Sequence, residues 1–327
     1  MRVNAVFEGG GVKAIGLAGA VSEAEKRGVD FHQVAGTSSG SIVASLLAAG
    51  YTGNDMKTII MNTPFQRFLK KSWIHQVKWV GPVFRLFIKK GLYAGEELEQ
   101  WIYKLLLAKG IRTFGDLRKG QLKIIASDIT MGRLLVLPDD IARYGIQPEH
   151  LTVAKAVRMS TSIPYFFEPV IIRKNAPRRK GESFSDQFVH IVDGGLLSNF
   201  PLWIFDQKQR WEQGARPLPT LGFQLVGRGG HEGNKIIGPL TMLQALFSTM
   251  MDAHDERYIE EHKAFRTIKI PTLDVHTTEF DLSKEKSLAL YEAGQKAAAK
   301  FLDKWSYESY LEKCKAMKVA ARAMAER

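Results

Sequence analysis

The first fifty residues repeat one pattern twice: a short apolar run, a glycine-containing turn and a helix-forming stretch. The run at 3–7 enters Glu8-Gly9-Gly10-Gly11, and a helical stretch over 12–27 follows. The run at 33–35 enters Gly36-Thr37-Ser38-Ser39-Gly40, and a second helical stretch covers 41–49. Strands that alternate with helices favour a parallel sheet with helices on its faces. The sequence therefore predicts an α/β fold with a parallel-rich central sheet.

Later segments extend this pattern without a visible linker or internal repeat. Helical stretches are expected from 96, over 240–263, over 285–304 and at the C-terminal end. Further strand-like runs lie at 122–126, 134–137, 169–172, 188–192, 221–226 and 267–270. We expect a single domain over residues 1–327, with a C-terminal helical extension at about 283–327.

One segment differs in composition from the rest of the chain. Residues 56–95 contain eight Lys or Arg, no Asp or Glu, and several aromatic residues. A basic aromatic segment of this kind is typical of a helical insertion that contacts a membrane interface. The alternative is a helix pair whose aromatic side chains pack on the body of the protein. A second basic segment, within the polar loop at 173–187, is expected to be solvated.

Charge and cysteine content exclude several classes of protein. The chain has 46 Lys and Arg against 34 Asp and Glu, a formal net charge of +12, which indicates an anionic partner. No nucleic-acid-reading module accompanies the charge, so an anionic membrane surface is the expected partner and nucleic acid is not. Cys314 is the single cysteine, which excludes an internal disulfide and a multi-cysteine metal site. Without a signal peptide or a long apolar segment, we expect a cytoplasmic protein with peripheral contact to the inner membrane face.

The segment Gly36-Thr37-Ser38-Ser39-Gly40 matches the pattern G-x-S-x-G between a predicted strand and a predicted helix. In this context the pattern is typical of a nucleophile elbow, in which a sharp turn exposes a serine hydroxyl in a cleft. Ser38 is thus the candidate nucleophile, and Gly36 and Gly40 are its supporting glycines. The alternative is an ordinary glycine–serine turn that caps a helix.

The base that would activate Ser38 is less evident, because none of the eight histidines lies in a recognisable motif. Asp193-Gly194-Gly195 follows the apolar run at 188–192, so the aspartate is expected at a strand end, where α/β sites gather. A carboxylate within reach of Ser38 could accept the hydroxyl proton directly. An Asp–Gly turn without a catalytic role is the alternative.

The cluster Gly9-Gly10-Gly11 with Lys13 opens the first helical stretch, and its backbone amides could stabilise an oxyanion. The same residues also allow a rival interpretation. Gly9, Gly11 and Ala14 satisfy G-x-G-x-x-A, and Asp30 lies downstream as in a dinucleotide-binding fingerprint. However, that fingerprint needs an acidic residue at the end of the second strand, and Asp30 precedes the run at 33–35.

Taken together and in this order, the three motifs resemble the patatin-like phospholipase family, in its bacterial form. The similarity covers about residues 4–201 and includes Met159-Ser160-Thr161-Ser162-Ile163-Pro164 before the candidate aspartate. The resemblance implies a three-layer α/β sandwich and a Ser38–Asp193 dyad supported by Gly36, Gly40, Gly194 and Gly195. It also implies an oxyanion hole at Gly9, Gly10, Gly11 and Lys13, with the amides of Gly10 and Gly11 as the strongest candidates, and no metal or cofactor. The chain departs from the family pattern at Ala14, where a glycine is usual.

The activity implied by the resemblance is that of a lipid acyl hydrolase of the phospholipase A or lysophospholipase type. Its expected substrates are phospholipids or lysophospholipids, cleaved through an acyl-enzyme. A serine acyltransferase is the nearest alternative, because the acyl group could pass to an alcohol instead of water. A dinucleotide-binding protein is the more distant one.

Overall fold

The computed structural model describes most of the chain, with interruptions. The described residues are 1–69, 91–174, 183–206, 217–227, 236–238, 242, 245–246, 249, 264–273, 275, 279 and 281–325. Three expectations therefore lie partly outside it: residues 70–90 of the basic aromatic insertion, residues 175–182 of the basic loop, and most of the helix over 240–263. The limits of the predicted insertion and C-terminal extension stay predictions.

The centre of the fold is an eight-stranded sheet in the order β10-β9-β1-β2-β4-β8-β7, with β5 also paired to β4. The five strands β10, β9, β1, β2 and β4 are parallel, whereas β5, β7 and β8 pair antiparallel. The bounds are β1 (Arg2–Phe7), β2 (Asp30–Thr37), β4 (Leu122–Asp128), β5 (Arg133–Leu137), β7 (Val170–Arg173), β8 (Phe188–Asp193), β9 (Thr220–Val226) and β10 (Thr267–Pro271). A separate two-stranded sheet pairs β3 (Gly91–Tyr93) with β6 (Tyr165–Phe167).

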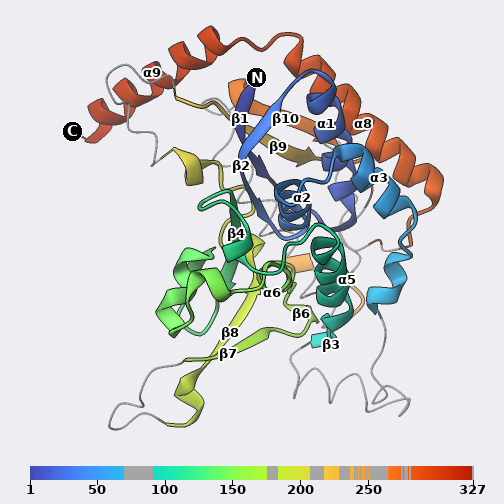
Figure 1. The fold of residues 1–327 in the computed structure, drawn as a ribbon, viewed down its shortest axis with the longest axis vertical. Helices are drawn as coiled ribbons and strands as arrows, with labels where there is room; N and C mark the ends of the chain where they lie inside the picture. The colour runs from blue at the N-terminus through green and yellow to red at the C-terminus, as the bar shows by residue number, and fades with distance from the viewer. Residues whose placement is uncertain are drawn as a thin grey trace.

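The helices pack around this sheet, with α1, α3 and α8 gathered on one side of it (Figure 1). Side-chain caps begin several of them: Thr52 forms a capping box with Asp55 at α3, and Thr152 and Ser283 cap α6 and α8. The bounds are α1 (Ile15–Lys26), α2 (Ser39–Ala48), α3 (Gly53–Met61), α5 (Glu96–Leu107), α6 (Val153–Ser160), α8 (Lys284–Leu302) and α9 (Tyr307–Ala325). In the described part of the chain, every helix is too short or too polar to cross a membrane.

Side chains that alternate between the two faces of the sheet form two separate apolar clusters, one on each face. Val3, Ala5 and Phe7 of β1 join the large core beneath the helices, whereas Val6 joins a smaller cluster on the opposite face. Successive strand residues point to opposite faces of a sheet, so this division follows directly from the strand geometry. Among the described residues, the segment 200–205 covers the second face through Phe200 and its neighbours.

One edge of β4 is shared by two strands that run toward each other. Strand β5 occupies one edge of β4 along Ile124–Asp128, so β2 and β8 must both use the other edge. On that edge Thr37, the last residue of β2, pairs with Ile125, and Asp193, the last residue of β8, pairs with Ala126. Because β2 is parallel to β4 and β8 is antiparallel, their carboxyl ends meet at adjacent residues of β4.

The structure confirms the predicted fold class and extends several predicted elements. Strand β2 begins at Asp30, three residues before the predicted run, and the predicted first helix begins as a short 3-10 turn at Gly11–Ala14. The sequence analysis did not predict β3, β6, α3 or α6. These elements have three to nine residues, too few for hydrophobic periodicity to identify them reliably.

The contact between α1 and α8 depends on glycine, which gives a test of the fold. A Cβ atom at Gly294 would overlap the carbonyl oxygen of Gly16, and one at Gly19 would overlap that of Tyr291. We expect Gly294→Ala to lower the free energy of unfolding by about 1–3 kcal/mol, because the helices must separate. The gain of up to about 1 kcal/mol in helix propensity opposes this loss. Urea unfolding would measure it, with Gly227→Ala as the control, since its Cβ would meet nothing within 4 Å; equal stability of both variants would contradict the packing argument.

Candidate active site

Ser38 lies on the sharp turn between β2 and α2. Its backbone has φ 50° and ψ −128°, a positive φ that non-glycine residues rarely adopt. The Ser38 amide donates to Ser160 Oγ at 2.9 Å, and Ser160 Oγ in turn donates to the carbonyl of Ile125 at 2.5 Å. The strained turn is therefore tied to β4 through a buried hydroxyl, and α2 begins directly after the serine with the positive end of its dipole at the site.

Gly36 and Gly40 allow the close packing of this turn. A Cβ atom at Gly36 would overlap the carbonyl oxygen of Gly40, and one at Gly40 would overlap the carbonyl oxygens of Phe7 and Glu8. The two glycines thus allow direct contact between the backbones of β2, α2 and the end of β1. This is the steric requirement that the G-x-S-x-G pattern predicts.

Asp193 is fully buried at the carboxyl end of β8, within hydrogen-bond distance of Ser38. Ser38 Oγ donates to Asp193 Oδ2 at 2.6 Å, and the Gly195 amide donates to Asp193 Oδ1 at 2.7 Å. Burial raises the pKa of Asp193 to about 7, although these two hydrogen bonds oppose the rise. No described histidine forms a hydrogen bond with either side chain. The arrangement is a serine hydroxyl beside a carboxylate poised to accept a proton near neutral pH.

The backbone around Asp193 is also fixed to β4 and to the segment after α6. The Asp193 amide donates to the carbonyl of Ser162 at 2.9 Å. A Cβ atom at Gly194 would overlap the carbonyl oxygen of Ile125, so this glycine permits close contact with β4. Of the two glycines in the Asp-Gly-Gly motif, Gly194 supplies space and Gly195 supplies an amide donor.

The glycine cluster after β1 lies against the same turn, and its three amides differ in their partners. The Gly9 amide donates to the carbonyl of Asn199 at 3.3 Å, and the Gly10 amide donates to Ser39 Oγ at 3.0 Å. The Gly11 amide has no acceptor among the described residues. Since the Gly9 amide is already engaged by a backbone carbonyl, Gly10 and Gly11 are the better candidates for oxyanion donors. Lys13 lies half-buried one turn later, and its amide donates to the Gly10 carbonyl.

Several polar residues of the site had no individual role in the sequence analysis. Arg158, on α6, is 4% exposed, and its guanidinium donates to Ser162 Oγ and to the backbone carbonyls of Ala94 and Glu168. Burial lowers the pKa of Arg158. Its partner Ser162 presents the carbonyl that receives the Asp193 amide, and Ser160 holds the amide of Ser38. Both serines belong to the segment 159–164, which resembles the family's segment before the aspartate. That resemblance was the only feature of the sequence that pointed to them.

The residues of the alternative dinucleotide-binding fingerprint do not come together at one site, because Asp30 lies far from the glycines at 9 and 11. Asp30 begins β2, at the end of the strand opposite to Ser38, and its carboxylate pairs with Arg2 at 2.9 Å on the exposed surface. A dinucleotide fold needs its acidic residue at the carboxyl end of that strand. Within the described ranges, no group of three or more His, Cys, Asp or Glu side chains is arranged to hold a metal ion.

Comparison with known proteins agrees with these features. Residues 5–206 match the family model described as patatin-like phospholipase. The chain is 42% identical over 312 residues to the uncharacterized protein YqhO of Bacillus subtilis, a match that covers 94% of this chain and 100% of YqhO. It is 26% identical over 209 residues to the uncharacterized protein R571 of Acanthamoeba polyphaga mimivirus, covering 62% of this chain and 61% of R571.

A solved structure shares the architecture. The crystal structure of VipD from Legionella pneumophila superposes with a TM-score of 0.51 and 16% identity, covering 92% of this chain and 66% of VipD. At that identity the likeness concerns the fold, and this chain spans slightly less than two thirds of VipD. Family membership rests instead on the family model, which matches more than half of the sequence. The chain belongs to the patatin-like phospholipase family.

Proposed function

We propose that this protein is a lipid acyl hydrolase of the phospholipase A or lysophospholipase type that uses Ser38 and Asp193. Membership of the family supports a lipid hydrolase in general. The observation that carries the finer proposal is the 2.6 Å hydrogen bond from Ser38 Oγ to Asp193 Oδ2, between two buried side chains on a strained turn and a strand end. A serine hydroxyl is a weak nucleophile until a neighbouring base accepts its proton.

In the first proposed step, Ser38 Oγ attacks the carbonyl carbon of a lipid ester while its proton passes to Asp193 Oδ2. The amides of Gly10 and Gly11 and the start of α2 favour the negative charge that develops on the carbonyl oxygen. For the Gly10 amide this requires exchange of its present acceptor, Ser39 Oγ. When the tetrahedral intermediate collapses, the ester bond breaks and the leaving alkoxide takes the proton from Asp193.

In the second step, water replaces the leaving alcohol. Asp193, ionised again, accepts a proton from this water as it attacks the acyl-enzyme carbonyl. Collapse then returns the proton to Ser38 Oγ and releases the fatty acid. Both steps require the same carboxylate in its charged form, so the pKa of Asp193 controls the whole cycle.

We also propose that the enzyme meets its substrate at an anionic membrane surface. The net charge of +12 supports electrostatic attraction to such a surface. Exposed apolar side chains cluster on the β4–β5 turn, on β7 and at the approach to β8: Ile129 (49% exposed), Met131 (48%), Ile171 (54%) and Phe184 (62%). Ile171 pairs with His190, and the Arg173 guanidinium lies 6.0 Å from the Phe184 ring centre. Asp193 follows His190 by three steps along the extended strand β8, about 10 Å, so this surface lies near the proposed dyad.

Hydrolysis of phospholipids and short-chain p-nitrophenyl esters tests the dyad. We expect Ser38→Ala and Asp193→Asn each to lower kcat/KM by at least about a thousandfold, since each removes one partner of the proton transfer. Ser45→Ala is the matched control, because Ser45 is a buried serine on α2, the helix that follows Ser38, and its hydroxyl donates to the carbonyl of Ile42. Circular dichroism would show that all three variants are folded. Retention of wild-type activity by either dyad variant would refute the assignment.

The activity should also depend on pH through Asp193. Because the carboxylate must be ionised and burial raises its pKa to about 7, we expect kcat/KM to rise about tenfold per pH unit below pH 7 and to level above it. The measurement is the pH profile of short-chain ester hydrolysis under kcat/KM conditions. A profile already level at pH 5 would show that the free enzyme does not use a carboxyl with a raised pKa.

The same pKa predicts how stability changes with pH. A carboxyl whose pKa is raised on folding holds its proton more tightly in the folded state, so it favours folding below its unfolded pKa of about 4 and loses this effect as the pH rises through about 7. Between pH 5 and pH 8 this group alone should remove about 2–3 kcal/mol from the free energy of unfolding. Asp193→Asn lacks the titration, so urea unfolding at both pH values should show a smaller decrease for the variant. An identical decrease in the free energy of unfolding for wild type and variant would argue against a raised pKa of Asp193.

Sedimentation with liposomes that contain phosphatidylglycerol tests the membrane surface. We expect the double variant Ile171→Asp, Phe184→Asp to bind several-fold more weakly than wild type, because it places charge where apolar side chains would enter the interface. The matched control is Leu107→Asp, Leu288→Asp, which adds the same charge at exposed leucines of α5 and α8, 45% and 38% exposed. If the two double variants lost liposome binding equally, the loss would be due to the change in net charge alone, and the proposed surface would be contradicted.

A further inference from the structure

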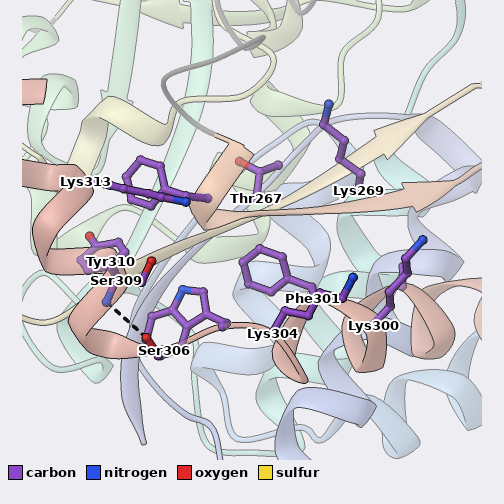
Figure 2. A pocket seen from close by; sticks show the side chains of 12 residues that line it. Thr267, Lys269, Lys300, Phe301, Lys304, Ser306, Ser309, Tyr310 and Lys313 are labelled. Atoms are coloured by element: carbon purple, nitrogen blue, oxygen red, sulfur yellow. Dashed lines mark hydrogen bonds between the residues drawn. The ribbon is translucent and has the colours of Figure 1, made fainter. Parts of the chain in front are cut away.

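A cavity lies at the β10 edge of the sheet, away from Ser38. It has a volume of about 430 Å³ and is formed by the edge strand β10, the end of α8 and the start of α9 (Figure 2). Strands β9 and β1 separate β10 from β2, so this cavity is not part of the site around Ser38 and Asp193. Its volume falls within the range of small-molecule binding sites.

The lining of this cavity is strongly basic. Lys269, Lys300, Lys304 and Lys313 contribute to it, and its lining contains no Asp or Glu. Figure 2 shows Lys313 on one side of the Phe301 ring and the other three lysines on the opposite side. Lys269 lies on β10, Lys300 on α8, Lys304 in the turn between α8 and α9, and Lys313 on α9, so the fold brings the β10 lysine together with the three that follow one another in sequence.

Two acidic residues that adjoin the lining, directly or through a partner, form ion pairs with arginines. Asp303, next to Lys304 in sequence, pairs with Arg27 at 2.5 Å, and Asp206 holds the buried Arg266 at 2.6 Å. Glu308 and Glu312 lie on α9 but outside the lining. Among the described residues, none of the four lysines has an ion-pair partner. Lys313 Nζ lies over the Phe265 ring, 5.7 Å from its centre. Four ammonium groups without an acidic partner around one cavity create a local potential that attracts an anion.

The rest of the lining limits the kind of anion. Phe301 and Trp305 give the cavity an apolar wall, and Ser306 and Ser309 add hydroxyl groups. Tyr310 takes part through its ring, because its hydroxyl already accepts the amide of Thr220 at 3.0 Å. A phosphate monoester carries nearly two negative charges at neutral pH and several acceptor oxygens, which suits several lysines better than a single carboxylate does. Its organic group would pack on the aromatic wall.

We propose that this cavity, formed by Lys269, Lys300, Lys304 and Lys313 with Phe301 and Trp305, binds a phosphate monoester at a site separate from the hydrolytic centre. The phosphate group lies among the lysines and the organic part contacts the two aromatic rings. Such a ligand has two sources, the headgroup of a lipid such as phosphatidic acid, or a free small phosphate ester. The binding does not require that the proposed hydrolysis takes place.

Isothermal titration calorimetry on the full chain carrying Ser38→Ala, which prevents consumption of an ester ligand, tests this site. The probes are dihexanoyl phosphatidic acid below its micelle concentration, sn-glycerol 3-phosphate, inorganic phosphate, and dihexanoyl phosphatidylcholine as a ligand without net charge. We expect saturable one-to-one binding of dihexanoyl phosphatidic acid and much weaker binding of the phosphatidylcholine. The pair Lys300→Ala, Lys304→Ala should raise Kd at least tenfold.

The control pair is Lys284→Ala, Lys296→Ala, which removes the same charge from exposed lysines on α8 that do not line the cavity. It should change Kd less than twofold. Binding of phosphatidic acid with no measurable binding of sn-glycerol 3-phosphate would assign the site to a lipid headgroup, and comparable binding of both would assign it to free phosphate esters. The proposal fails if no phosphate probe gives saturable heat, or if the two lysine pairs weaken binding equally.

Discussion

The geometry of the site depends on one constraint, the sharing of a single edge of β4 by two strands of opposite direction. Strand β2 covers the first half of that edge and β8 covers the second, so Thr37 and Asp193 pair with the neighbouring residues Ile125 and Ala126. Backbone hydrogen bonds thus set the distance between a serine turn and an aspartate that lie 155 residues apart in sequence. The same strand anchors both sides again, since Ser160 links Ser38 to Ile125 and Gly194 packs on the Ile125 carbonyl.

Close packing around this junction also sets its electrostatics. Asp193 is fully buried, and in the described part of the chain its carboxylate accepts hydrogen bonds from the Ser38 hydroxyl and the Gly195 amide alone, so desolvation outweighs these bonds and raises its pKa to about 7. A carboxylate of ordinary pKa would accept the serine proton less readily. The burial that makes Asp193 a better base also makes its charged form costly to fold, so the proposed activity and stability have opposite pH dependences. The strained backbone of Ser38 further lowers the stability of the folded state at this junction.

The fold also distributes the large positive charge unevenly. Some basic side chains form ion pairs, as Arg27 does with Asp303 and Arg266 with Asp206. Arg158 is buried among backbone carbonyls and a serine hydroxyl, where it supports the segment that holds Asp193. The four lysines that line the cavity at the β10 edge have no acidic partner among the described residues, so part of the excess positive charge is concentrated there. Net charge alone indicated an anionic partner but not where on the molecule such a partner would bind.

The sequence by itself determined the α/β class, the elbow at Ser38 and the candidate aspartate, because these depend on short-range patterns: apolar runs, glycine spacing and turns at strand ends. It also indicated which glycines must lie where backbones approach closely. Only the tertiary structure decided that Asp193 reaches Ser38, that Ser160 and Ser162 hold the two backbones, and that the Gly9 amide is already engaged by Asn199. It likewise brought the lysine of β10 together with those of α8, α9 and the turn between these helices. These features depend on strand order and on contacts between distant segments, and no local pattern in a single sequence encodes which strand edges will pair.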